Sequence, residues 1–281
     1  FAMKKLLSLV LVLSFALLAA AGCSNDQPSK QGDGQQTELT PIVVGASPTP
    51  HAEILALIKD DLAKKGYKLE IKEYNDYVFP NTSLEDGEID ANYFQHITYM
   101  NDFNESNGTH LVSLAPVHYE PMGLYPGKVA TIEELPDGAT IGIPSDPTNE
   151  ARALLLLEAA GLITLDPEAG LKATPFDVTD NPKNLKFNEM EAALLPRTLV
   201  DLDMAVINGN YALQAELSAA TDALVSEAAD SLAATNYANV LAIKEGNEED
   251  PKLKALAEAL CSDTVKNYIN ETYNGNVQTV F

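Results

Sequence analysis

The sequence contains little cysteine and little positive charge. Its 281 residues include 2 cysteines, and 18 Lys and Arg stand against 41 Asp and Glu, giving a formal net charge of −23 at pH 7. A polyanion of this size is repelled by nucleic acid and by anionic membrane surfaces. Neither is therefore expected to bind the folded chain directly.

The motifs of several enzyme classes are also missing. The sequence has no G-x-S-x-G motif, no Gly-rich phosphate-binding loop and no C-x-x-C pair. Its histidines, His51, His96, His110 and His118, are scattered. His51, His96 and His118 could in principle converge on an ion, but no two of them share a helix face. We therefore predict no catalytic site, no cofactor and no metal site.

The N-terminal segment has the features of a lipoprotein export signal. Two lysines precede an apolar run over residues 6–21, which ends in small residues before Cys23. A run of this length after basic residues predicts a secretory signal rather than a membrane span. LAAAGC (18–23) resembles the lipobox of bacterial lipoproteins, in which the Cys thiol carries the lipid; the alternative is an ordinary signal with a chance Cys. If Cys23 is acylated, Cys261 remains alone and no intrachain disulfide can form.

The residues after Cys23 are polar and rich in Gln, Gly and Ser as far as Thr40. Such a composition has almost nothing to bury and predicts a disordered tether. A flexible segment of this length reaches roughly 20–25 Å, which would hold a globular body just off a bilayer. We therefore expect a signal peptide over residues 1–22 and a lipidated Cys with its tether over 23–40.

From residue 41 onward, strand and helix patterns alternate. Short apolar or alternating runs predict strands, and apolar residues at helical spacing predict helices. The β-α-β beginning implies a right-handed crossover and a doubly wound α/β sheet, and the pattern restarts near residue 139, which indicates two similar lobes. The predicted strands cover 42–46, 68–74, 89–92, 139–144, 203–208 and 239–244, and the predicted helices cover 51–65, 149–157 and 252–270.

Three polar residues lie where α/β sheets bind ligands, outside strand ends. Arg152 falls in the first turn of a predicted helix, where free N–H groups and a guanidinium can share one carboxylate. The alternative for Arg152 is an ion pair with Glu150 or Asp146. Asn208 and Asn239 stand at strand ends and could bind an amino or carboxylate group, although Asn is also a common turn residue.

Aromatic side chains are concentrated in residues 75–81 and 92–99, just past predicted strand ends. Aromatic rings suit a thioether, because sulfur contacts ring edges favourably by about 0.3–1.5 kcal/mol. Core packing is the alternative explanation for these rings.

From about Ile42 to the C-terminus the chain resembles the NlpA/MetQ lipoprotein family. The similar stretches are long, follow one another in order and extend over most of the chain. They are NDYVFPN (75–81), GEIDANYFQHITYM (87–100), HYEPMGLY (118–125), IPSDPTNEARALLLLEAAGLI (143–163), DNPKNLKF (180–187), LPRTL (195–199), AVINGNYA (205–212) and NYANVLAI (236–243).

The resemblance implies a two-lobed, periplasmic-binding-protein-like clamshell with the ligand in the cleft between the lobes. Lobe 1 would comprise residues 41–121 and 241–281, and lobe 2 residues 122–240. The implied function is that of an extracytoplasmic, lipid-anchored receptor, a monomer and not an enzyme, which delivers L-methionine to the membrane permease of an ATP-driven (ABC) importer with a cytoplasmic ATPase. D-methionine, a methionyl dipeptide or another small apolar amino acid are alternative ligands, and a surface scaffold or adhesion lipoprotein is an alternative function.

The resemblance also implies which residues bind the ligand. Those expected to form the aromatic pocket are Tyr77, Phe94, His96 and Tyr99. Those expected to contact the α-carboxylate and α-amino groups are Asn149, Arg152, Asn208 and Asn239. Residues 210–235 resemble the family poorly, so that edge of the cleft is expected to differ.

Overall fold

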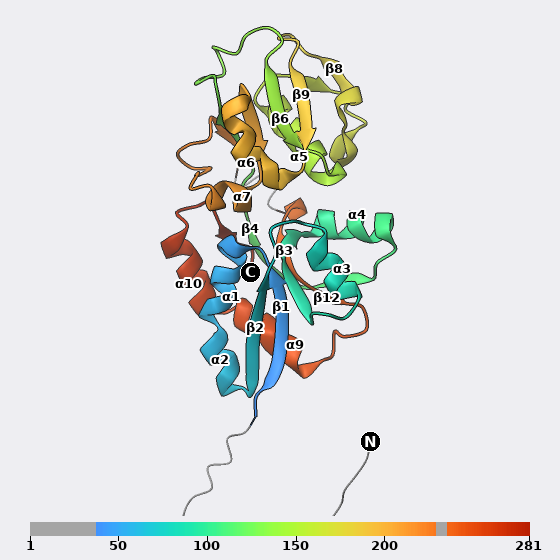
Figure 1. Cartoon of the computed structure of the whole chain (residues 1–281), viewed down its shortest axis with the longest axis vertical. Helices are drawn as coiled ribbons and strands as arrows, with labels where there is room; N and C mark the ends of the chain where they lie inside the picture. Colours follow the sequence, from blue (N-terminus) through green and yellow to red (C-terminus); the bar gives the residue numbers. More distant parts are fainter. Residues whose placement is uncertain (1–37, 229–234) are drawn as a thin grey trace, which may run out of the picture. The chain divides into compact units, whose positions relative to one another are not determined.

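The computed structural model describes residues 38–228 and 235–281. The predicted signal peptide, Cys23 and most of the predicted tether lie outside the described residues. Within them, no helix has the length and apolar character needed to cross a bilayer. The described strands form one sheet of six strands, one of five and a two-stranded ribbon (Figure 1).

The six-stranded sheet has the order β13-β4-β12-β3-β1-β2. β1 runs parallel to β2 and β3, and β12 runs antiparallel to β3 and β4. The strands are β1 (Thr40–Ala46), β2 (Tyr67–Glu73), β3 (Ala91–His96), β4 (Leu111–Tyr119), β12 (Asn239–Lys244) and β13 (Gln278–Thr279). The helices beside this sheet are η1 (Pro48–Ala52), α1 (Glu53–Leu57), α2 (Lys59–Lys64), α3 (Phe79–Glu85), α4 (Ile97–Asn107), α9 (Pro251–Leu260) and α10 (Asp263–Thr272).

Apolar side chains cover both faces of this sheet. Consecutive residues of a strand point to opposite faces, and in β12 Leu241 and Ile243 join the core formed with α1, α2, α9 and α10. Val240 and Ala242 join a separate core on the other face with residues of α3 and α4. Burial on both faces explains why β12 is a continuous apolar run in the sequence.

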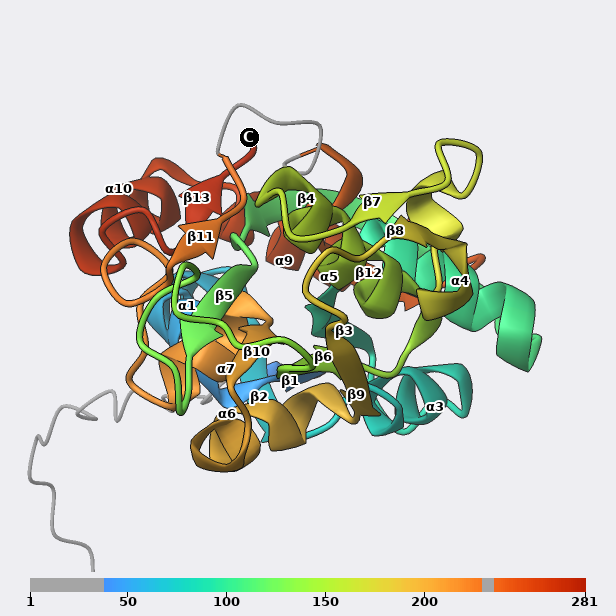
Figure 2. The same cartoon turned by 90° about the horizontal axis from the view of Figure 1, so that it is seen from above.

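The five-stranded sheet has the order β11-β5-β10-β6-β9, as Figure 2 shows. β6 is parallel to β9 and β10, whereas β5 is antiparallel to β10 and β11. The strands are β5 (Gly123–Pro126), β6 (Thr140–Pro144), β9 (Lys186–Met190), β10 (Met204–Ile207) and β11 (Val225–Ser226), and the ribbon is β7 (Thr164–Leu165) with β8 (Val178–Asp180). The helices are α5 (Pro147–Ala159), η2 (Gly170–Lys172), η3 (Pro175–Asp177), η4 (Ala192–Leu194), α6 (Leu195–Thr198), η5 (Leu199–Asp201) and α7 (Gly209–Gln214).

This second sheet is also covered on both faces. Met204 and Val206 of β10 pack in a core with α5, whereas Ala205 and Ile207 pack in another with residues of α6 and α7. The molecule is therefore a two-lobed α/β structure in which each lobe is a sheet between helices. We call the six-stranded sheet with its helices the first lobe and the five-stranded sheet with its helices the second lobe.

The chain passes from the first lobe to the second between β4 and β5, through Glu120 and Pro121, and it returns before β12. Because β12 begins at Asn239, Val240 and Leu241 lie inside the first sheet. The residue boundaries given for lobes 1 and 2 above stay a prediction.

Two predicted elements differ from the observed ones. The strand expected at 89–92 is β3, which begins at Ala91 and ends at His96. The helix expected over 252–270 is two helices, since α9 ends at Leu260 and Ser262 caps α10 by accepting a hydrogen bond from the Val265 backbone N–H at 3.4 Å. The cap side chain satisfies an N–H group that has no partner inside the new helix, which explains the break.

Candidate functional site

One small cavity between the lobes is lined by every residue predicted to bind ligand. Its volume is about 20 Å³, room for about one water molecule. The predicted residues that line it are Tyr77, Phe94, His96, Tyr99, Asn149, Arg152, Asn208 and Asn239. The sequence analysis missed four further lining residues, which are Gln95, Glu120, Gly209 and Asn210.

The positions of these residues follow from the sheet topology. β3 and β10 each run parallel to a neighbouring strand, and His96 ends β3 while Asn208 follows β10 directly. Asn149 and Arg152 lie near the start of α5, the helix that follows β6. Asn239 is the first residue of β12, which runs the opposite way to β3 and pairs with His96. Strand ends from both lobes thus meet at one place, as expected for ligand sites in α/β sheets.

Aromatic rings form one wall of the cavity. The Tyr77 ring centroid lies 5.8 Å from that of Phe94, 5.7 Å from that of Tyr99 and 4.9 Å from that of Tyr211. The Tyr77 hydroxyl donates to Asn210 Oδ1 at 2.5 Å, so this residue of the first lobe contacts the second. Burial raises the pKa of the Tyr77 hydroxyl well above its usual value. The wall is therefore apolar and uncharged at neutral pH.

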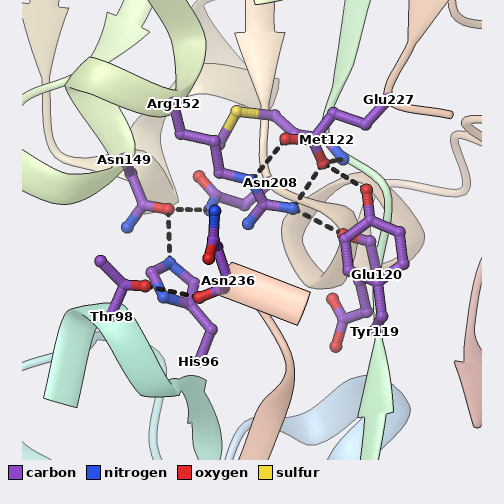
Figure 3. Close-up of polar contacts among 10 residues, drawn as sticks. All are labelled: His96, Thr98, Tyr119, Glu120, Met122, Asn149, Arg152, Asn208, Glu227 and Asn236. Atoms are coloured by element: carbon purple, nitrogen blue, oxygen red, sulfur yellow. Dashed lines mark hydrogen bonds and ion pairs between the residues drawn. The ribbon is translucent and has the colours of Figure 1, made fainter. Parts of the chain in front are cut away.

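A chain of hydrogen bonds fixes the amides on the opposite side (Figure 3). The Tyr99 backbone N–H donates to His96 Nδ1 at 3.0 Å, so His96 Nε2 carries the proton that it donates to Asn149 Oδ1 at 3.1 Å. Asn149 Nδ2 in turn donates to both carboxylate oxygens of Asp146, at 2.9 and 3.0 Å. Burial, with a smaller contribution from Arg152, lowers the pKa of His96 to about 3, so this imidazole is neutral at physiological pH.

Asn208 is oriented by the same chain. Its Nδ2 donates to Asn149 Oδ1 at 2.8 Å, and its Oδ1 is buried without a hydrogen-bond partner among the described residues. A buried acceptor left without a donor costs free energy, on the order of 1–3 kcal/mol. Asn208 therefore presents an acceptor oxygen in the cavity, whereas the amide of Asn149 is engaged at both ends within the protein.

Arg152 forms an ion pair that the sequence did not predict. Its Nε and Nη2 donate to Glu227 Oε1 and Oε2 at 2.8 and 2.6 Å, and Nη2 also donates to the Glu120 carbonyl oxygen at 2.8 Å (Figure 3). The ion-pair partner is thus Glu227, and the alternatives Glu150 and Asp146 were wrong. No local sequence pattern connects two residues 75 positions apart.

Glu227 connects Arg152 to the crossing between the lobes. It also accepts hydrogen bonds from the Tyr119 hydroxyl at 2.7 Å and the Met122 backbone N–H at 2.8 Å. Burial alone would raise the pKa of the Glu227 carboxyl, but the charge of Arg152 and these hydrogen bonds outweigh it and lower the pKa. Both partners are therefore ionised, and the charge of Arg152 is matched inside the protein.

Glu120 lies in a second buried polar cluster, with two histidines. Its Oε1 is 2.6 Å from His118 Nε2 and 3.3 Å from His51 Nε2, and all three side chains are almost fully buried. His118 Nδ1 forms a short hydrogen bond with the Tyr93 hydroxyl. Burial lowers the pKa of His51 to about 4 and that of His118 to about 3. A charged residue at the end of an apolar strand, directly before a proline, was the signal in the sequence that could have identified Glu120.

The fold and this site define a class. Two α/β lobes meet at a small, two-sided cavity with aromatic rings on one side and fixed polar groups on the other, which is the arrangement of a two-lobed substrate-binding protein rather than an enzyme. The chain belongs to the NlpA lipoprotein family, whose model matches residues 42–281. The family expected from the sequence is thus confirmed.

Several relatives have names or structures that describe a ligand. The methionine-binding lipoprotein MetQ of Bacillus subtilis is 40% identical over 283 residues, covering 99% of each chain. The membrane lipoprotein TpN32 of Treponema pallidum is 44% identical over 83% of this chain and 86% of that protein. The crystal structure of a nutrient-binding protein from Burkholderia cenocepacia bound to methionine is 39% identical, with a TM-score of 0.81 over 85% of this chain and 100% of that one.

Proposed function

We propose that this protein is a lipid-anchored receptor on the extracytoplasmic side of a cell membrane, which binds L-methionine and delivers it to the permease of an ATP-driven importer. The observation that carries the proposal is the cavity with two unlike sides. Tyr77, Phe94 and Tyr99 give it an aromatic side that suits a thioether. Asn208 and Arg152 give it a polar side that suits the charged end of an amino acid. Relatives named or solved as methionine-binding proteins support the same ligand.

In this proposal, each of the eight predicted residues has a role. The thioether would lie against the rings of Tyr77, Phe94, His96 and Tyr99, and the charged end would lie beside Arg152, Asn208 and Asn239. The bonds from Arg152 to Glu227 use Nε and Nη2, so we place the ligand carboxylate at Nη1. Asn149 would hold His96 and Asn208 in position, since its own amide bonds lie within the protein.

The volume of the cavity indicates that the lobes move. A space of about 20 Å³ is far smaller than an amino acid, so the walls must separate to admit one. We propose that the lobes hinge at the two chain crossings and that the ligand, by contacting both, favours the closed state. X-ray scattering with and without methionine tests this, because identical curves would contradict closure.

Calorimetric titration tests the ligand itself. The protein should first be unfolded and refolded to remove any bound compound, then titrated with L-methionine, D-methionine, methionyl dipeptides and leucine. We expect L-methionine to bind most tightly. Silence toward every methionine compound together with a clear response to another solute would overturn the proposed ligand, and silence toward all solutes would favour a scaffold or adhesion role.

A further inference from the structure

Glu120 combines deep burial with a place in the wall of the cavity. Its side chain is about 5% exposed, and it lies directly after β4 at the crossing between the lobes. A Cβ atom at position 209 would stand 2.6 Å from Glu120 Cβ and 3.0 Å from Glu120 Oε2, so the carboxylate occupies space that only glycine leaves open there. The position of this carboxylate is therefore closely determined by its surroundings.

The proton positions in the cluster make both histidines donors to Glu120. The Tyr93 hydroxyl has to donate to His118 Nδ1, because a neutral imidazole whose Nε2 faces a carboxylate carries its proton on Nε2. His51 Nε2 faces two acceptors, Asn239 Oδ1 at 3.1 Å and Glu120 Oε1 at 3.3 Å, so it too carries the proton. His51 Nδ1 is then an acceptor, and it is buried without a partner among the described residues.

These assignments describe a buried carboxylate with hydrogen bonds but no permanent counter-ion. Within residues 38–228 and 235–281, the ion-pair partners of Glu120 are His51 and His118, and both imidazoles are neutral. Arg152 is committed to Glu227 through two hydrogen bonds. A buried anion is costly unless a cation pairs with it. The cluster is therefore suited to a cation that arrives with the ligand.

A second observation in the same cavity supports this conclusion. Asn208 Oδ1 is a buried acceptor without a partner among the described residues, and its direction is fixed by the bond from Asn208 Nδ2 to Asn149. An ammonium group has three donors and no acceptor. We propose that Glu120 and Asn208 bind the free α-ammonium group of the ligand, with His51 and His118 as positioning residues. This inference rests on the proposed function and narrows the ligand class to amino acids or peptides with an unblocked α-amino group.

The cluster also has the composition of a metal site, since the donor atoms of His51, His118 and Glu120 lie within 4.8 Å of one another. The distances favour hydrogen bonding. Two ligands bound to one tetrahedral zinc at about 2.0–2.1 Å stand roughly 3.3 Å apart, whereas His118 Nε2 and Glu120 Oε1 are 2.6 Å apart. That separation is the length of a charge-assisted hydrogen bond with a proton between the two atoms.

The test compares ligands with and without the α-amino group. Wild-type protein should bind L-methionine at least about thirty-fold more tightly than 4-(methylthio)butanoate, which lacks the amino group, or N-acetyl-L-methionine, in which the group is uncharged. Glu120→Gln keeps the shape and removes the charge, so it should weaken methionine binding by a similar factor and leave binding of 4-(methylthio)butanoate nearly unchanged. Glu88→Gln, on an exposed carboxylate paired with Lys72, is the matched control and should alter neither affinity.

Other results would overturn the inference and not the function. If the wild-type protein bound methionine and 4-(methylthio)butanoate equally, the α-ammonium site would be wrong while methionine binding stood. Should Glu120→Gln fail to fold, the wild-type ligand comparison still decides, together with His118→Gln, which should weaken methionine more than the amine-free compound. Binding of Zn²⁺ that competes with methionine and is lost in Glu120→Gln would assign the cluster to a metal instead. Binding of neither methionine nor its analogues would overturn the proposed function itself.

Discussion

Arg152 and Glu227 lie 75 residues apart in the sequence and form two nearly parallel hydrogen bonds of 2.8 and 2.6 Å. The guanidinium also lies over the Tyr237 ring, with its carbon 4.3 Å from the centroid. Both charged side chains are more than nine-tenths buried. The pair therefore belongs to the closed interior next to the ligand cavity and contributes to holding this side of the second lobe together.

Removing one member of this pair should destabilise the protein more than removing both. Arg152→Ala leaves the Glu227 carboxylate buried and unpaired, which costs about 3–5 kcal/mol of unfolding free energy, whereas the double variant Arg152→Met, Glu227→Gln should recover much of that loss. Arg152→Lys should recover only part, because an ammonium cannot donate two parallel bonds. Urea denaturation of all variants measures the coupling.

The matched control for the pair is Lys64→Ala, which removes an exposed partner of Asp61. We expect its denaturation midpoint to equal that of the wild type, because exposed ion pairs contribute little. Equal stability of Arg152→Ala and the wild type would show that the Glu227 pair is not a structural element. Arg152→Ala should also weaken methionine binding in protein shown to be folded, if the ligand carboxylate lies beside this residue.

How far the sequence predicted the fold depends on what each strand buries. β12 was predicted with its observed bounds because both of its faces pack against apolar side chains, which makes the sequence a continuous apolar run. β3 was misplaced because three of its buried residues, Asn92, Gln95 and His96, are polar. Their burial is possible only through hydrogen bonds made elsewhere in the fold, such as that from Asn92 Nδ2 to the Pro80 carbonyl oxygen.

The same reasoning applies to the site. Residues that follow parallel strands, such as Asn208, could be predicted because sheet topology brings strand ends together. Glu227 could not be predicted, since its role depends on a fold that places it beside a helix from a distant part of the sequence. The convergence of His51 and His118 on Glu120 likewise depends on how η1 and β4 meet in space.

Replacing Tyr77 should reduce selectivity more than it reduces folding. Tyr77→Ala removes the ring that contacts Phe94, Tyr99 and Tyr211, so methionine affinity should fall about tenfold and discrimination against leucine and norleucine should narrow. Tyr77→Phe is the control, because it keeps the ring and removes only the hydroxyl that donates to Asn210. Competition titration with the three amino acids measures both effects. Unaltered selectivity in Tyr77→Ala would place the thioether elsewhere.

Membrane attachment should depend on Cys23 alone. Because no described helix can cross a bilayer, a lipid on Cys23 would supply the anchor, and Cys23→Ala should move the protein from the membrane fraction to the soluble fraction. Cys261→Ala is the matched control, since this partly buried thiol lies between α9 and α10 and should not alter fractionation. A Cys23→Ala protein that stayed firmly with membranes would contradict lipid anchoring at this residue.

Methionine affinity should rise with pH and then level off. Burial raises the pKa of the Glu120 carboxyl, because the attraction from His51 and Arg152 does not fully offset desolvation. A bound ammonium favours the carboxylate, so it lowers that pKa and binding releases a proton wherever Glu120 is protonated in the free protein. Affinity is therefore lost as pH falls through the raised pKa and is fully present above it.

The other groups around Glu120 do not change charge in the same range. The pKa values of His51 and His118 are lowered to about 4 and about 3, those of Tyr77 and Tyr93 are raised well above their usual value, and Arg152 stays charged beside Glu227. Calorimetric titration from pH 5 to pH 8, in buffers of different ionisation enthalpy, counts the protons released. Glu120→Gln should show a flat profile with no release. A wild-type affinity that is constant over this range, or an equal slope in Glu120→Gln, would mean that Glu120 does not bind the ammonium group.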